Sequence, residues 1–377
     1  MLRTPRNSGV PSITALGILC FLLAAVTGIW RIALLRGFYL PAIPDAWPPH
    51  GHWMVAGFLA AMIMGERLTV LPVRYLAWVP IVYVLTALVL HTGNPFIRII
   101  HMLALFGWWI HRWHAFRMFH VWTIPFGEAV ALTTLTVALY TSRGLATRPD
   151  VALAGLAFPV TVIALERMAF PLRAGRPGAI LAFLGLMLWC GMWMATVLWG
   201  PFSMPRMGLL TTGLVIGVAW NDTAVRALLR SHRNRRVPIG LSGLHDTLRW
   251  TLAVAYGWWF LAATAMIRWP HMPATVAKDV TFHALGLGMI FTMILAHAPI
   301  MLPAMLKKPP VLNVPIQWIV LFQWLTVGRV TADLFMELLP TVWRWTGWLT
   351  GMLHTAVFLI YLATIRIRIT KNVNSQF

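Results

Sequence analysis

The chain has 377 residues, of which 59% are hydrophobic and only 11% are charged. Soluble domains carry about 25% charged residues, so this composition excludes a soluble globular protein and predicts an integral membrane protein. The formal net charge of +20 could indicate a nucleic-acid-binding protein, but the basic residues lie in short loops between apolar segments. This placement is typical of membrane orientation. We therefore expect membrane lipid, and not nucleic acid, as a partner.

Twelve apolar segments of roughly 20 residues follow one another, each long enough to cross a hydrocarbon layer about 30 Å thick. Their approximate limits are 13–35, 51–72, 75–92, 97–115, 122–142, 150–170, 178–200, 205–228, 244–267, 279–304, 312–335 and 345–367. The first segment has spanning length and no clear cleavage site after it, so we interpret it as a transmembrane helix and not a signal peptide. The sequence thus predicts an all-α, polytopic membrane protein in which residues 1–377 form a single transmembrane domain.

Lysine and arginine are concentrated in alternate loops, which all fall on one side of the membrane if the twelve spans are correct. These residues are Arg3, Arg6, Arg74, Arg112, Arg117, Arg173, Arg176, the basic run at 230–236, Lys307, Lys308, Arg366, Arg368 and Lys371. The loop at 141–150, with Arg143 and Arg148, is the exception. Because positively charged loops remain in the cytoplasm, we expect both termini on the cytoplasmic side.

Histidine is unusually frequent for so apolar a chain, with 13 residues. Ionisable groups inside membrane spans are costly, so they usually serve a function or have a partner. The histidines concentrate on the second, fourth, tenth and twelfth predicted spans, which all run from outside to inside. They are His50, His52, His101, His111, His114, His283, His297 and His354. Of these, His52, His101 and His283 fall at comparable depth near the outer surface.

Neutral imidazole is a common metal ligand and the usual axial ligand of heme iron. Two imidazoles from different helices at one depth can hold a heme between them. We therefore predict His52 and His283 as ligands of a b-type heme, with His50 and His101 as the next candidates for iron or a second metal. The alternative is that each histidine near the surface only reaches water and caps a helix.

His297 lies fourteen residues after His283, which places the two on one helix face within about 40° and about 21 Å apart. This spacing makes His297 a candidate for a separate metal or proton-binding group. No second predicted helix carries a matching pair. The sequence therefore does not predict two hemes stacked across the membrane.

The second and tenth predicted spans share a pattern. His52-x4-Gly57-x4-Met62-Ile63 matches His283-x4-Gly288-x4-Met293-Ile294, and both helices run in the same direction. The glycines do not lie on the histidine face. We interpret them as positions where another helix packs closely.

Further charged residues lie inside predicted spans. Asp222–Arg226 and Arg329–Asp333 have i,i+4 spacing, so we expect each pair to neutralise itself within one helix. Glu128 has no partner in its own helix, which leaves a proton path or a cross-helix hydrogen bond as interpretations.

The charged pairs near span ends and the two cysteines are expected to have structural roles. Glu66–Arg67 and Glu166–Arg167 lie near predicted cytoplasmic ends, where we expect both pairs to be interfacial. Cys20 and Cys190 each lie inside an apolar segment with no CxxC motif, and we expect them to be buried packing residues.

The two histidine-containing segments resemble motifs of the NnrS family. The stretch HGHWMVAGF is similar to the family pattern H-x-H-E-M-x-x-G-F, and HALGLGMIFTM is similar to H-A-L-x-x-G-x-x-x-T-M. The matching positions are His50, His52, Met54, Gly57, Phe58, His283, Ala284, Leu285, Gly288, Thr292 and Met293. Trp53 stands where the family has Glu, and the Arg and G-H-T-G stretch that normally follow the second motif are missing.

This resemblance implies a twelve-helix protein of the bacterial inner membrane that binds heme and acts in the nitric oxide response or in membrane redox chemistry. It also implies copper, although the departures from the motifs weigh against a copper site. A heme-dependent oxidoreductase activity and a membrane or periplasmic redox partner would fit this reading.

Two other classes of protein remain open. A proton-coupled transporter or channel would use the histidines to relay protons or bind substrate, and Pro299 and Pro303 would break one of its helices. An accessory subunit of a larger membrane enzyme would use them to stabilise an interface. A heme absorbance band in the purified protein separates the first reading from both.

Overall fold

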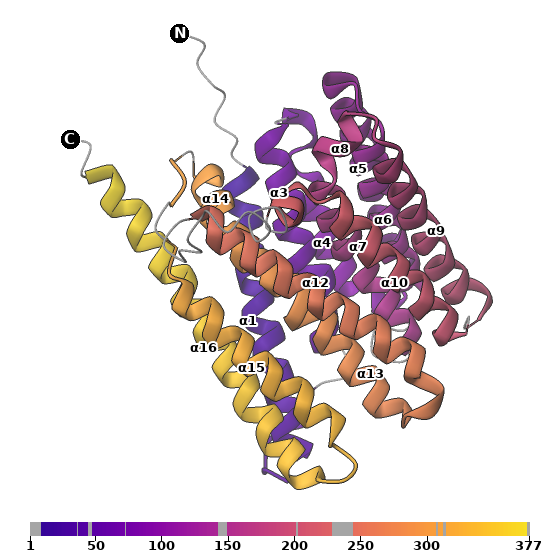
Figure 1. Cartoon of the computed structure of the whole chain (residues 1–377), viewed down its shortest axis with the longest axis vertical. Helices are drawn as coiled ribbons and strands as arrows, with labels where there is room; N and C mark the ends of the chain where they lie inside the picture. The colour runs from indigo at the N-terminus through magenta and orange to yellow at the C-terminus, as the bar shows by residue number, and fades with distance from the viewer. Residues whose placement is uncertain are drawn as a thin grey trace. The chain divides into compact units, whose positions relative to one another are not determined.

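The computed structural model describes residues 9–35, 37–43, 47–71, 73–141, 149–200, 203–227, 244–306, 308–311 and 314–374. Their regular secondary structure is helical, with no β-strand among them (Figure 1). Seven helices in this part of the chain are long and apolar enough to cross a membrane. The protein is therefore an all-helical membrane protein, as its composition predicts.

The helices have bounds close to those of the predicted spans. The α-helices are α1 (Gly9–Leu35), α2 (His50–His52), α3 (Ala60–Val70), α4 (Val79–Val89), α5 (Pro95–Phe119), α6 (Thr123–Thr141), α7 (Pro149–Arg167), α8 (Ala169–Arg173), α9 (Pro177–Trp199), α10 (Met204–Asn221), α12 (Leu244–Arg268), α13 (Ala274–His283), α14 (Thr292–Met305), α15 (Ile316–Leu334) and α16 (Pro340–Asn374). The short 3₁₀ segments are η2 (Arg74–Leu76), η3 (Leu90–Thr92) and η4 (Trp269–His271). Two π-helical segments are η1 (Trp53–Leu59) and η5 (Ala284–Phe291).

Each of the twelve predicted spans coincides with helix in the described residues. Some boundaries differ: α13 begins at Ala274, directly after Pro273 and earlier than predicted, and α10 ends at Asn221 because the backbone of Asp222 is extended. Whether all twelve segments cross the membrane stays a prediction. Several residues used to orient the chain lie outside the described residues, namely Arg3, Arg6, Arg143, Arg148, the run at 230–236 and Lys307.

The chain divides into two compact units. Unit 1 comprises Met1–Gly28, Pro41–Val162 and Cys190–Gly200, and unit 2 comprises Ile29–Leu40, Ile163–Trp189 and Pro201–Phe377. The sequence predicts a single domain, because no linker interrupts it. Each unit is built from three separate stretches of the chain, so a boundary between the units would not appear in the sequence as one linker.

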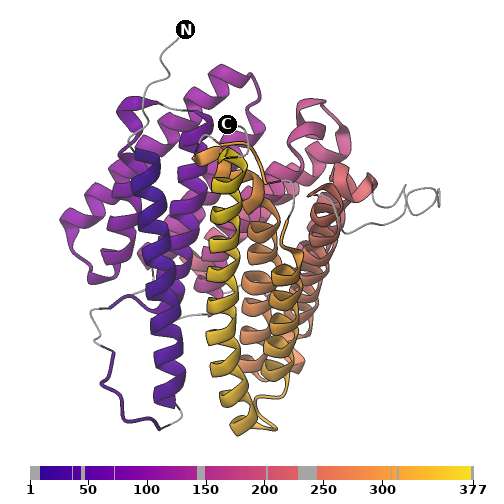
Figure 2. The same cartoon turned by 90° about the vertical axis from the view of Figure 1, so that its left-hand side faces the viewer.

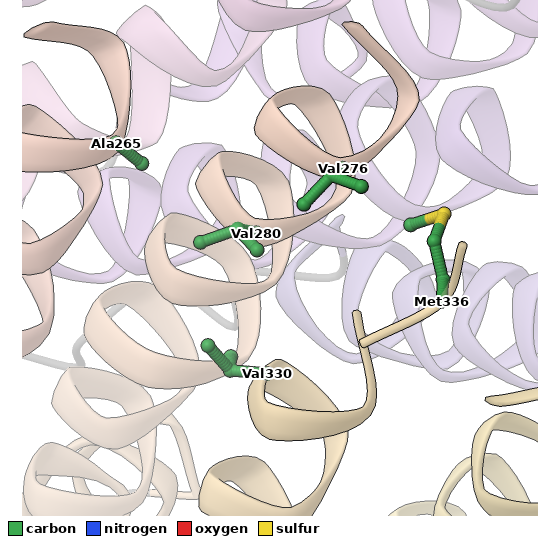
Figure 3. Close-up of a cluster of buried hydrophobic side chains, with 5 residues drawn as sticks. All are labelled: Ala265, Val276, Val280, Val330 and Met336. Carbon is green, nitrogen blue, oxygen red and sulfur yellow. The ribbon is translucent and has the colours of Figure 1, made fainter. Parts of the chain in front are cut away.

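Unit 2 contains the final helices of the chain. α15 and α16 lie side by side (Figures 1 and 2). A cluster of buried apolar side chains joins α12, α13 and α15, with Met336 just beyond α15 (Figure 3). The cluster comprises Ala265, Val276, Val280, Val330 and Met336. It holds α13, which ends at His283, against its neighbours.

The repeated sequence pattern has a structural counterpart in each unit. In unit 1, the π-helical segment η1 begins directly after His52, and in unit 2, η5 begins directly after His283. π-Helical segments are rare and are frequently found at functional sites. A π-helical segment thus directly follows the histidine of the repeated pattern in each unit.

The glycines of the repeat allow close helix contacts, as the sequence predicts. A Cβ on Gly57 would lie 2.8 Å from the Cβ of Cys20 in α1. A Cβ on Gly288 would overlap Trp258 of α12, both at its Cβ and at its ring. Each π-helical segment is therefore packed directly against the neighbouring helix through a glycine. Cys20 and Cys190 are buried, as expected.

We predict that Gly57→Ala and Gly288→Ala each destabilise the protein by about 1–3 kcal/mol, because the added methyl group overfills a packed contact. The measurement is the apparent melting temperature of the purified protein in detergent.

Gly51→Ala and Gly286→Ala are the matched controls, since a Cβ at either position meets nothing within 4 Å. Equal melting temperatures for Gly288→Ala and Gly286→Ala would contradict the close-contact interpretation.

Candidate cofactor site

The buried carboxylate of Glu128 is held by two arginines from other helices of unit 1. Arg67 Nε donates to Glu128 Oε1 at 2.8 Å, and Arg112 Nη1 donates to Oε2 at 2.5 Å. Glu128 is only 2% exposed. Because both oxygens accept from guanidinium groups, this residue joins α3, α5 and α6. Of the two interpretations made from the sequence, the cross-helix contact is the one observed.

Asp222 of unit 2 also pairs across helices. Arg167 forms a two-bond contact with it, Nε to Oδ2 at 2.9 Å and Nη2 to Oδ1 at 3.1 Å, and the Tyr256 hydroxyl donates to Oδ2 at 2.9 Å. The predicted Asp222–Arg226 pair is wrong, because Asp222 is extended and Arg226 bonds instead to the backbone oxygen of Asn221. Arg167 is accordingly a partner of a buried carboxylate and not a simple interfacial residue.

Hydrogen bonds occupy both ring nitrogens of three histidines. His297 Nδ1 donates to the Met293 carbonyl at 2.7 Å, and its Nε2 accepts from Arg167 Nη1 at 3.2 Å. His111 bonds to the Leu71 carbonyl and to Arg112. His354 bonds to the Thr350 carbonyl at 2.7 Å and to the Thr326 hydroxyl at 3.1 Å. In this arrangement His297, predicted as a metal ligand, has no lone pair left for a metal.

His283 is arranged differently, with one ring nitrogen held by a carboxylate. Its Nδ1 lies 2.6 Å from Asp333 Oδ2. Because a carboxylate only accepts, Nδ1 carries a hydrogen, and in the neutral ring the lone pair resides on Nε2. Among the described residues, no hydrogen bond reaches that Nε2. The side chain of His283 is 24% exposed, whereas that of Asp333 is fully buried.

Asp333 has two further partners, both in unit 2. Trp343 Nε1 donates to Oδ1 at 2.9 Å, and Arg329 Nη2 lies 3.2 Å from the same oxygen. The predicted Arg329–Asp333 pair is therefore confirmed. A carboxylate behind the imidazole is the usual support of a metal-ligating histidine, since it fixes the tautomer and raises ligand basicity.

Unit 1 gathers three histidines from different helices. The rings of His52 and His91 lie 6.1 Å apart, and His52 also interacts electrostatically with His101. His52 and His101 are fully buried. His50 is exposed and lies beside Gly28. The structure thus brings the predicted residues His52 and His101 into one region and places His50 at its surface.

His101 also presents an open lone pair. The Thr86 hydroxyl donates to the Val82 carbonyl at 2.6 Å, so its oxygen accepts from His101 Nδ1 at 2.9 Å. Nδ1 therefore carries the hydrogen. The buried Nε2 atom has no hydrogen-bond partner in the described part of the chain. A buried polar atom without a partner is costly and calls for a ligand or another explanation.

These partners could not be read from the sequence. Spacing within one helix indicates Arg329 as the partner of Asp333, but it cannot indicate Trp343 or Thr86, which lie on other helices. Thr86 and Thr326 each bond to a histidine of the next long helix. The Leu-Thr pair that contains each of them is too common in the chain to indicate this contact.

The described residues include no group of three or more histidine, cysteine, aspartate or glutamate side chains arranged to hold a metal ion. A free ion such as copper needs several protein ligands at once. Heme iron, held already by the porphyrin, needs only one or two imidazoles. A single imidazole nitrogen such as that of His283 is therefore compatible with heme iron but does not by itself make a site for a bare ion.

The fold and the site define a polytopic helical membrane protein with histidine-rich interior sites. The chain belongs to a family described as a domain of unknown function, DUF8744, whose model matches residues 12–367. No curated protein matches the chain, and no solved structure does so.

We predict that Glu128→Ala lowers the stability of the protein by about 3–5 kcal/mol, because it leaves two buried arginines without their shared carboxylate. The melting temperature in detergent measures this effect.

Glu337→Ala is the control, since Glu337 is exposed and contacts only the Thr275 hydroxyl among the hydrogen bonds identified. Its expected loss is at most about 1 kcal/mol. Similar melting temperatures for the two variants would contradict a structural role for the Glu128 contacts.

Proposed function

We propose that the protein is a membrane hemoprotein that holds a b-type heme through His283 and acts in nitrogen-oxide or other membrane redox chemistry. The observation that carries the proposal is the 2.6 Å contact between His283 Nδ1 and Asp333 Oδ2. It directs the lone pair of the ring to Nε2, the atom through which a supported imidazole binds iron. The resemblance to the NnrS family supports the same cofactor.

Four residues of unit 2 would have separate roles in holding the heme. His283 would supply the bond to iron, and Asp333 holds the ring in one tautomer. Trp343 and Arg329 hold Asp333 in turn. A bound heme would supply electron transfer or the binding of a diatomic gas. Electron transfer would fit a heme-dependent oxidoreductase with a membrane or periplasmic electron donor.

His52 and His50 remain further candidate ligands. His52 is fully buried, and a backbone hydrogen bond joins it to Ala87, so its orientation is fixed by unit 1. His50 is exposed and is the weaker candidate. Neither the burial of His52 nor the exposure of His50 favours copper as the bound metal.

We further propose that the chain crosses the bacterial inner membrane twelve times, with both termini in the cytoplasm. The helical segments at all the predicted spans support this number, and the basic loops support the orientation. A green fluorescent protein fused to the C-terminus should fluoresce, and alkaline phosphatase fused there should be inactive. Fusions after residue 93, between the third and fourth predicted spans, should give the opposite result. An active phosphatase at the C-terminus would contradict the proposed orientation.

Absorbance spectroscopy tests the heme proposal. Protein purified after heme-replete expression should show a Soret band and the reduced-minus-oxidised bands of a b-type heme. We expect His283→Ala to lose or strongly reduce the Soret band, because it removes the proposed bond to iron. His271→Ala is the control, since His271 is exposed and lies in a 3₁₀ turn of the same unit.

Folding is checked by size-exclusion chromatography of each variant. Wild-type protein without a Soret band would overturn the heme proposal and favour a transporter or an accessory subunit. An unchanged band in monodisperse His283→Ala would overturn the assignment of this ligand.

A further inference from the structure

The support of His283 is built by two facing helices of unit 2, α15 and α16, which lie side by side (Figures 1 and 2). On α15, Arg329 and Asp333 are four residues apart, so they lie on one face of that helix. On α16, Trp343 and Gly347 have the same spacing. Trp343 contacts Asp333, and Gly347 contacts Arg329. The two helices therefore face each other in a definite register at this point.

Gly347 makes room for the guanidinium group of Arg329. A Cβ at position 347 would overlap Arg329 Nη1. Arg329 is only 7% exposed, and Gly347 is buried. The guanidinium thus fills a space that exists because residue 347 has no side chain. This space keeps the positive charge of Arg329 beside Asp333.

The two oxygens of Asp333 have different surroundings. Oδ2 lies 2.6 Å from His283 Nδ1, whereas Oδ1 accepts from Trp343 Nε1 at 2.9 Å and lies 3.2 Å from Arg329 Nη2. Glu128 of unit 1 differs, because both of its oxygens accept from arginines. Asp333 therefore connects a candidate iron ligand to a buried positive charge.

A hydrogen bond behind a metal-bound imidazole sets how strongly the imidazole donates to the metal. A carboxylate is a stronger acceptor for this bond than a neutral group. A positive charge next to the carboxylate attracts part of its negative charge and weakens it as an acceptor. Because stronger donation stabilises oxidised iron, the strength of the acceptor is one of the factors that set the reduction potential of a heme.

From these contacts we propose that Arg329 is a positioning residue that raises the reduction potential of the heme on His283, by weakening Asp333 as the acceptor of the Nδ1 hydrogen. This inference rests on the proposed function, since it concerns the same heme. The side chain of His283 is 24% exposed, so part of it is accessible to a bound group. Gly347 supplies the space for Arg329, and Trp343 holds the oxygen that faces it.

Redox titration of the heme band in the full-length protein tests this proposal. Arg329→Gln should lower the reduction potential, because Asp333 then has no positive charge beside Oδ1. Asp333→Asn should raise it, because an amide oxygen is a neutral acceptor. Arg329→Lys keeps the charge and should lie closer to the wild type than Arg329→Gln does. An unchanged or raised potential in Arg329→Gln would overturn the proposal.

A double-mutant cycle shows whether Arg329 acts through Asp333. In the Asp333→Asn background, Arg329→Gln should shift the potential much less than it does in the wild type, since the carboxylate that transmits the effect is missing. Equal shifts in the two backgrounds would show that the charge of Arg329 acts on the heme directly, and would overturn the proposed role of Asp333 as the intermediate.

Gly347→Ala tests the same arrangement without removing a partner. The added methyl group must displace the end of the Arg329 side chain, so we expect a shifted potential. Gly351→Ala, one turn further along α16, is the matched control, since a Cβ there lies 3.6 Å from Ile29 in an ordinary contact. If Arg329→Gln is not monodisperse in size-exclusion chromatography, this pair decides, and equal potentials would overturn the proposal.

The failures of the two proposals can be told apart. Wild-type protein without heme overturns the proposed function, and the role of Arg329 with it. Wild-type protein with heme, whose potential does not fall in Arg329→Gln, overturns only the role of Arg329.

Discussion

The cost of burying an unpartnered polar group governs the interior of this protein. Water is scarce among apolar helices, so each buried charge needs a partner supplied by another side chain. Glu128 finds two arginines, Asp222 an arginine and a tyrosine, and Asp333 an arginine, a tryptophan and a histidine. Among the described residues, His283 is bonded through Nδ1 alone, which is why we propose it as the heme ligand.

The same constraint separates structural histidines from candidate ligands. His111, His297 and His354 have both ring nitrogens engaged, so they join helices as other polar side chains do. His283 has one nitrogen fixed by a carboxylate and the other open. Histidine count alone could not make this distinction, because it depends on the partner of each nitrogen.

Much of the fold could be predicted because it is encoded locally. Run lengths of apolar residues located the helices, and the repeated glycines indicated close contacts later found at Cys20 and Trp258. Cross-helix partners were harder to predict, since spacing within one helix identifies only neighbours on that helix. The spacing rule therefore identified Arg329–Asp333 but also suggested Asp222–Arg226, where Arg167 is the actual partner. The support of His283 by Asp333 joins residues fifty positions apart, which no local pattern reveals.

An experimental structure of the heme-replete protein would test this account most directly, by showing which imidazole nitrogen contacts a prosthetic group. Bound heme iron on the Nε2 of residue 283, with the carboxylate of residue 333 still on Nδ1, is the result we expect. Density for a protein side chain bonded to that Nε2, and no heme in either unit, would contradict it.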